Sequence, residues 1–87
     1  MTPNPIQITV RYFAAARAAA HAESEAVSVS SGATVDELVD ELGGRDERLA
    51  RVLQRCSYLR DGIAVRDRTT TLASGDTIDV LPPFAGG

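Results

Sequence analysis

Residues 34–44, Thr-Val-Asp-Glu-Leu-Val-Asp-Glu-Leu-Gly-Gly, predict an amphipathic helix that needs a sheet to cover. Thr34 and Glu37 have the spacing of a capping box, in which each side chain accepts a hydrogen bond from the other residue's backbone amide. Apolar residues follow at helical spacing and form one stripe: Val35, Leu38, Val39 and Leu42. Gly43-Gly44 predicts the end of the helix. The stripe must pack on another element, so the rest of the chain should supply a sheet.

Strand patterns occur on both sides of this helix. Residues 6–12 and 27–29 alternate apolar with polar side chains, and residues 77–81 form a last strand-like run. Asp61-Gly62 lies between two short apolar runs, which predicts a two-residue hairpin turn. Gly75-Asp76 predicts another turn. Periodicity and element order therefore favour an α+β roll, one mixed sheet with one main helix across its face, but they do not fix the strand order.

Two further helices are predicted. The alanine-rich residues 14–20 have high helix propensity. Asp46 can cap a second helical stretch whose apolar residues share one face: Leu49, Val52, Leu53 and Cys56. A free cysteine on such a face is usually buried and unreactive, and a catalytic Cys56 is the alternative.

The composition excludes several classes of function. The chain has 87 residues, enough for one small domain, and a net charge of −3, which does not attract nucleic acid or an anionic membrane. A single cysteine cannot form an internal disulfide, which fits the cytoplasm. No apolar run is long enough to span a membrane. His21 has no second ligand nearby, so no metal site is expected, and no constellation of base, nucleophile and metal predicts an enzyme acting alone.

The closing residues carry the functional prediction. Pro82 and Pro83 should hold the chain extended beyond the last strand, and Gly86-Gly87 has no side chains to obstruct a narrow channel. We therefore expect a loose lead-in over residues 1–5, a folded domain over 6–82 and a mobile reactive tail over 83–87. In this interpretation the carboxylate of Gly87 is the reacting group, and Gly86 keeps the approach to it clear.

Three segments resemble a known family. Residues 11–17 (RYFAAAR), residues 34–38 (TVDEL) and residues 72–87 (LASGDTIDVLPPFAGG) together resemble the MoaD type of ubiquitin-like sulfur carrier, in the MoaD/ThiS family. The resemblance runs from about Ile6 to Gly87. It implies the ubiquitin-like β-grasp fold, a mixed sheet wrapped around one main helix, with a flexible Gly-Gly tail.

The resemblance also implies a function. In the family, a partner adenylates the terminal glycine, here Gly87, and a sulfur donor converts the acyl-adenylate to a thiocarboxylate. The large subunit of molybdopterin synthase (MoaE type) then receives the tail, and sulfur passes to a pterin precursor. This chain would be the small subunit. It lacks a phosphate-binding loop, so the activating enzyme should bind ATP and Mg²⁺, and this chain should bind no cofactor.

Several residues have two interpretations. Phe84 is either a partner anchor, together with Pro82, Pro83 and Ala85, or a core residue. Phe13 and Arg17 either border the docking face or are a core residue and a solvated helix residue. The acidic residues of the main helix are either a solvated face or a docking patch: Asp36, Glu37, Asp40 and Glu41.

Two other functions remain open from the sequence. A carrier of the same family could serve thiamin-thiazole or cysteine biosynthesis, because those carriers share the fold and the Gly-Gly ending. A ubiquitin-like module could also act by non-covalent binding alone. These alternatives differ from the first in the partner or in whether the terminal carboxylate reacts.

Overall fold

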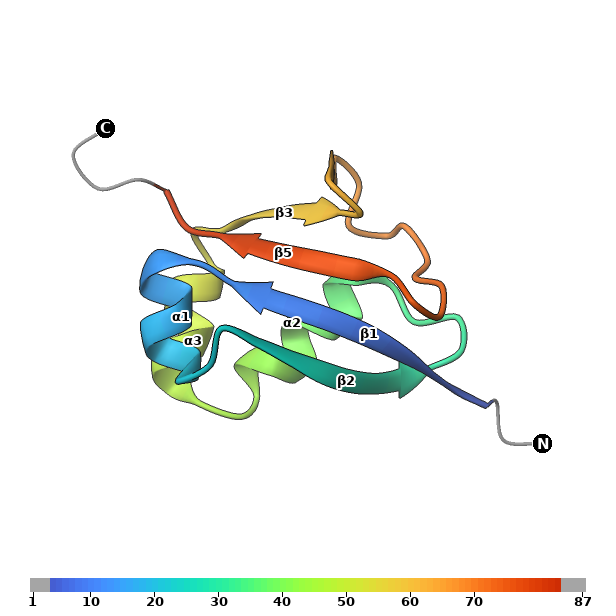
Figure 1. Ribbon diagram of the computed structural model, residues 1–87, viewed down its shortest axis with the longest axis horizontal. Helices are drawn as coiled ribbons and strands as arrows, with labels where there is room; N and C mark the ends of the chain where they lie inside the picture. The colour runs from blue at the N-terminus through green and yellow to red at the C-terminus, as the bar shows by residue number, and fades with distance from the viewer. Residues whose placement is uncertain (1–3, 84–87) are drawn as a thin grey trace.

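The described part of the chain is built on a five-stranded mixed sheet. The computed structural model describes residues 4–83. Its strands are β1 (Pro5–Tyr12), β2 (Ser24–Ser30), β3 (Ser57–Arg60), β4 (Ile63–Ala64) and β5 (Thr77–Leu81). They lie in the order β2-β1-β5-β3-β4 (Figure 1). Among the strand pairs of residues 4–83, only β1–β5 is parallel, and these first and last strands are neighbours at the centre of the sheet.

Within the described residues, three helices accompany the sheet: α1 (Ala14–Ala20), α2 (Val35–Gly43) and α3 (Glu47–Leu53). In the view of Figure 1, α2 lies behind the sheet, and α1 and α3 lie together at the end where β1 and β5 finish. α3 packs against both other helices. All three helices were predicted from propensity, capping and apolar spacing, and the structure confirms them.

The start of α2 is the predicted capping box. The Thr34 hydroxyl accepts from the Glu37 amide at 3.2 Å, and the Glu37 carboxylate accepts from the Thr34 amide at 3.0 Å. These bonds satisfy amides that have no partner inside the helix. The predicted stripe is buried: Val35, Leu38, Val39 and Leu42. It packs in one core with the inward side chains of the strands, among them Ile8, Val10, Ile78 and Val80.

Gly43 and Gly44 lie at the end of α2, as predicted, but they do not form the left-handed cap that a glycine usually provides there. The helix ends at Gly43, but Gly44 has φ −69° and ψ −15°, which is right-handed backbone open to any residue. A Cβ added at Gly43 would lie 3.4 Å from the Cβ of Ala50. Gly43 therefore permits the close approach of α2 to α3 rather than a left-handed turn.

The end of the second predicted helical stretch also differs. α3 ends at Leu53, and Cys56 lies beyond it, buried against the core. Val52 is only half-buried, so it is not a full member of the predicted core face. The hairpin turn is confirmed, because Asp61 and Gly62 both have positive φ, 49° and 84°.

This arrangement is the predicted β-grasp: a mixed sheet wrapped around one main helix, α2. No helix within residues 4–83 is long and apolar enough to cross a membrane. The extents assigned from the sequence to the lead-in, domain and tail stay predictions.

Replacing Thr34 with alanine should lower the free energy of unfolding by about 1 kcal/mol, because the Glu37 amide loses its acceptor. Urea denaturation monitored by circular dichroism measures this. Thr34→Ser keeps the hydroxyl and is the control. Equal destabilisation by both variants would contradict the role given to the hydroxyl.

Candidate functional site

The root of the tail lies at the centre of the sheet. β5 ends at Leu81, between β1 and β3, and Pro82 and Pro83 follow it. Pro82 is buried and Pro83 is exposed. The predicted reacting and anchoring residues lie outside the described residues: Phe84, Ala85, Gly86 and Gly87. What the structure places is therefore the surface from which this segment departs.

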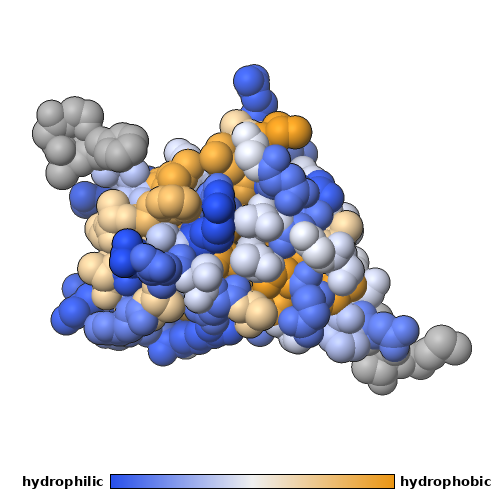
Figure 2. All heavy atoms as spheres, in the orientation of Figure 1, coloured by the Kyte–Doolittle hydropathy of each residue, from blue (hydrophilic) through white to orange (hydrophobic). Residues whose placement is uncertain are grey.

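An apolar patch lies next to that root on the open face of the sheet, the face away from α2. Because Tyr58, Ile78 and Val80 point into the core, their strand neighbours point outward. The open-face patch consists of Phe13, Leu59, Ala64 and Leu81. The register supports this grouping, because Leu59 pairs with Ala64. Figure 2 shows the open face, with hydrophobic residues gathered beside the end of β5.

Phe13 belongs to this patch and not to the core. Its amide donates to the Val80 carbonyl at 3.2 Å, which holds it beside the end of β5. Phe13 is 39% exposed, so the core alternative is wrong. Arg17 is exposed on α1 and forms an ion pair with Glu23. The docking roles predicted for Phe13, Arg17, Pro82 and Pro83 stay predictions.

A charge pair that the sequence analysis missed crosses the central strands. The Arg11 guanidinium donates to both carboxylate oxygens of Asp79, at 2.6 and 2.8 Å. The Asp79 residue is only 5% exposed, whereas the Arg11 side chain is 53% exposed. Hydrogen bonding to Asp79, and attraction to its charge, raise the pKa of Arg11. The pair fixes the register of β1 against β5, directly before the root of the tail.

The only sequence signal for this pair is an aspartate inside an apolar strand. Alternation places Asp79 on the face opposite Ile78 and Val80, where a carboxylate is usually solvated. Its burial depends on Arg11, and that neighbour follows from the parallel pairing of β1 with β5. The strand order, which periodicity does not give, was needed to find it.

The remaining candidate residues lie elsewhere. Cys56 is 6% exposed, and its thiol contacts the Val52 carbonyl at 3.2 Å. Burial raises the pKa of Cys56 to about 11, although Arg68 opposes the shift. Within the described ranges, no group of three or more His, Cys, Asp or Glu residues could hold a metal ion, and His21 joins none. The acidic residues of α2 are exposed: Asp36, Glu37, Asp40 and Glu41.

Comparison with protein-family models shows which family the chain belongs to. A model of the ThiS family matches residues 10–87. The chain belongs to the ThiS family. A search of the curated proteins finds no match.

Solved structures resemble this ThiS-family chain over almost its whole length. SAMP1, a small archaeal modifier protein from Haloferax volcanii, is 28% identical, with 93% of this chain and 99% of that chain covered and a TM-score of 0.81. A putative molybdopterin converting factor subunit 1 from Pyrococcus furiosus is 25% identical, with 91% and 99% covered and a TM-score of 0.82.

A third match comes from a complex. One chain in the Helicobacter pylori complex of subunits 1 and 2 of molybdopterin-converting factor is 24% identical, with 94% and 100% covered and a TM-score of 0.71. At 24% identity, this match supports a shared fold and nothing more. Family and fold together make this chain a ubiquitin-like protein with the ThiS/MoaD-type sulfur-carrier fold.

Cys56 should react slowly with a disulfide reagent in the folded protein. With a pKa of about 11, only about one thiol in ten thousand is ionised at pH 7. The rate should rise roughly tenfold per pH unit between pH 7 and 9, because the thiolate is the nucleophile. The absorbance of the thiolate that the reagent releases measures the reaction rate. Protein unfolded in urea, with an ordinary thiol pKa of about 8.5, is the control. Equal rates at pH 7 would contradict the burial argument.

Proposed function

We propose that this chain is a sulfur carrier whose Gly87 is adenylated and thiocarboxylated by partners, and that it acts as the small subunit of molybdopterin synthase. The observation that carries the proposal is the place of the tail root in a ThiS-family chain. Pro82 and Pro83 leave the central strand of the sheet directly beside the open-face patch. A partner that covers the patch would therefore meet the tail as well.

The proposed chemistry begins by making a carboxylate reactive. The charge and resonance of a carboxylate oppose nucleophilic attack. Its oxygen therefore attacks the α-phosphorus of ATP, and pyrophosphate leaves. A sulfur nucleophile supplied by the donor protein next attacks the acyl carbon of the adenylate and displaces AMP. When that sulfur is the outer sulfur of a donor persulfide, the product is an acyl disulfide. A second thiol then attacks the donor sulfur of this S–S bond and forms a new disulfide with the donor, which leaves the outer sulfur on Gly87 as a thiocarboxylate.

The sequence explains why partners are needed for these steps. It has no Gly-x-x-x-x-Gly-Lys-Ser/Thr loop to hold phosphates. The activating enzyme would therefore bind ATP and Mg²⁺ and stabilise the charge that develops in the transition state. In this proposal the chain contributes the terminal carboxylate and the surfaces that position this carboxylate in the active site of the partner. A cycle that uses ATP and a reduced sulfur donor belongs in the cytoplasm.

The choice of pathway draws on the similar structures. The Pyrococcus protein is named a putative molybdopterin converting factor subunit 1, and the Helicobacter structure is a complex of subunits 1 and 2. These names favour a MoaE-type large subunit as the partner that receives the charged tail. Carriers for thiamin-thiazole or cysteine biosynthesis would use the same activated Gly87 with another acceptor.

A second candidate function comes from the Haloferax relative, which is named a modifier protein. The same acyl-adenylate could be attacked by an amine of another protein, which would join Gly87 to that protein through an amide. All nine basic residues of this chain are arginine, so it has no lysine to accept a second copy. A conjugate would therefore hold single copies of the chain, not side-chain-linked polymers of it.

The intact mass of the chain should increase after incubation with a family activating enzyme, ATP, Mg²⁺ and a sulfur donor. The expected gain corresponds to one oxygen replaced by sulfur, because Gly87 becomes a thiocarboxylate. Mass spectrometry measures it, and a variant lacking Gly87 is the control. An unchanged mass, with the same enzyme shown to charge its own carrier, would contradict the proposal. Covalent conjugates with other proteins in a lysate would support the modifier function instead.

Replacing Phe13 with alanine should weaken binding to a MoaE-type large subunit about tenfold, because the open-face patch loses its largest apolar side chain. Isothermal titration calorimetry measures the affinity. Ile63→Ala is the matched control, because Ile63 is 73% exposed but lies outside the patch. If Ile63→Ala weakened binding as much as Phe13→Ala, the patch would not be the docking surface.

A further inference from the structure

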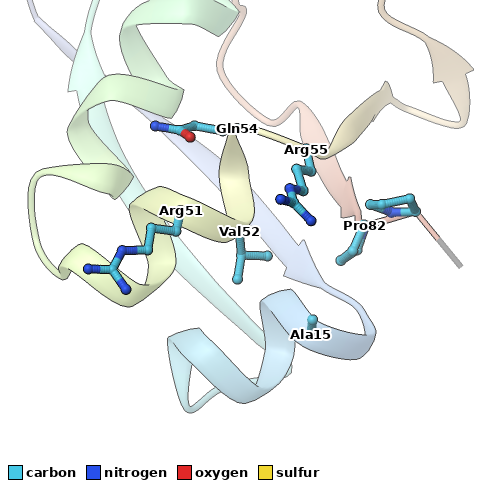
Figure 3. A pocket seen from close by; sticks show the side chains of 7 residues that line it. Ala15, Arg51, Val52, Gln54, Arg55 and Pro82 are labelled. Carbon is cyan, nitrogen blue, oxygen red and sulfur yellow. The ribbon is translucent and has the colours of Figure 1, made fainter. Parts of the chain in front are cut away.

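A groove lies between α1 and α3, on the helical side of the tail root. Its volume is about 610 Å³. Ala15 on α1, Val52 on α3 and Pro82 supply its apolar floor. In Figure 3, Val52 points from α3 toward α1, where Ala15 lies. Ala15 is exposed and Val52 is half-buried, so the described residues leave apolar surface uncovered here.

Two arginines border this floor. Arg55 extends toward Pro82, whereas Arg51 lies at the α3 edge of the groove with its guanidinium directed away from Pro82 (Figure 3). Both residues are exposed. The four ion pairs of the described part use other arginines: Arg11, Arg17, Arg45 and Arg60. On a chain with a net charge of −3, this groove is therefore bordered by two arginines that form no ion pair within residues 4–83.

We propose that this groove binds an acidic segment of the activating enzyme, with an apolar side chain on the floor and carboxylates at Arg51 and Arg55. A guanidinium binds a carboxylate through paired, charge-assisted hydrogen bonds, so acidic side chains are the complementary ligands. The proposal rests on the proposed function, because that function supplies the enzyme.

The position of the groove explains what such binding would achieve. Pro82 belongs to the groove floor and directly follows Leu81 of the open-face patch. An enzyme that contacts both surfaces holds the tail root from both sides of the sheet. Fixing the root limits where the terminal carboxylate can reach, and orientation of this kind favours reaction with bound ATP.

The test is the steady-state kinetics of adenylation, followed by ATP–pyrophosphate exchange with the activating enzyme and the full chain. The double variant Arg51→Gln/Arg55→Gln should raise KM for the carrier about tenfold and leave kcat unchanged, because exposed charge pairs contribute modestly to affinity. The difference from the unsubstituted chain should shrink at high salt. Arg48→Gln/Arg66→Gln removes the same charge outside the groove and should leave KM unchanged.

A second pair of variants tests the floor. Ala15→Gln fills the groove with a larger polar side chain and should also raise KM. Ala18→Gln is the matched control, because Ala18 is exposed on the same helix but does not line the groove. Both positions are exposed, so both variants should fold, and urea denaturation checks this.

The outcomes separate this proposal from the proposed function. If the unsubstituted chain is adenylated and the groove variants have its KM, the groove proposal is overturned and the carrier function stands. A lower KM in Arg51→Gln/Arg55→Gln would overturn it too, because the groove would then hold the chain's own terminal carboxylate. If size-exclusion chromatography shows the unsubstituted chain to be a dimer and the groove variants to be monomers with KM unchanged, the groove binds a second copy and the proposal is overturned. If no adenylation occurs at all, the carrier function fails and the groove proposal fails with it.

Discussion

The first and last strands of the sheet, β1 and β5, form a parallel pair at its centre. Burial of Val10, Ile78 and Val80 against α2 holds this pair from one side, and the Arg11–Asp79 ion pair holds it from the other. Bringing together two strands so far apart in sequence costs chain entropy, and burial of the shared core offsets that cost. Breaking this pair would separate β2 from β3 and β4 and leave α2 without a continuous surface.

This pairing also determines where the tail begins. Because β5 lies between β1 and β3, Pro82 and Pro83 leave the sheet at its best-supported strand and not at an edge. The open-face patch lies on one side of that point, and the groove between α1 and α3 lies on the other. A rigid base with two flanking surfaces suits a protein whose terminal residues must be presented to other proteins.

Caps, apolar spacing and turn residues in the sequence predicted the helices and the hairpin turn correctly. The Thr34–Glu37 capping box, the buried stripe of α2 and the Asp61-Gly62 turn were all predicted from short-range spacing, and the structure confirms them. These features succeed because caps, periodicity and turn residues act over a few neighbouring positions. The resemblance of residues 72–87 to sulfur carriers gave the family, which the ThiS-family match confirms. The reactive role of Gly87 stays a prediction.

The tertiary structure decided what depends on strand order and packing. Alternation alone does not reveal that Asp79 is buried, since its partner Arg11 lies on a strand that is adjacent only in space. Phe13 was ambiguous between core and docking face until its position beside Val80 showed it exposed. The groove required α1, α3 and Pro82 to meet. Short-range spacing thus determined the elements and their caps, and long-range pairing determined which side chains form a surface, because neighbours in space need not be neighbours in sequence.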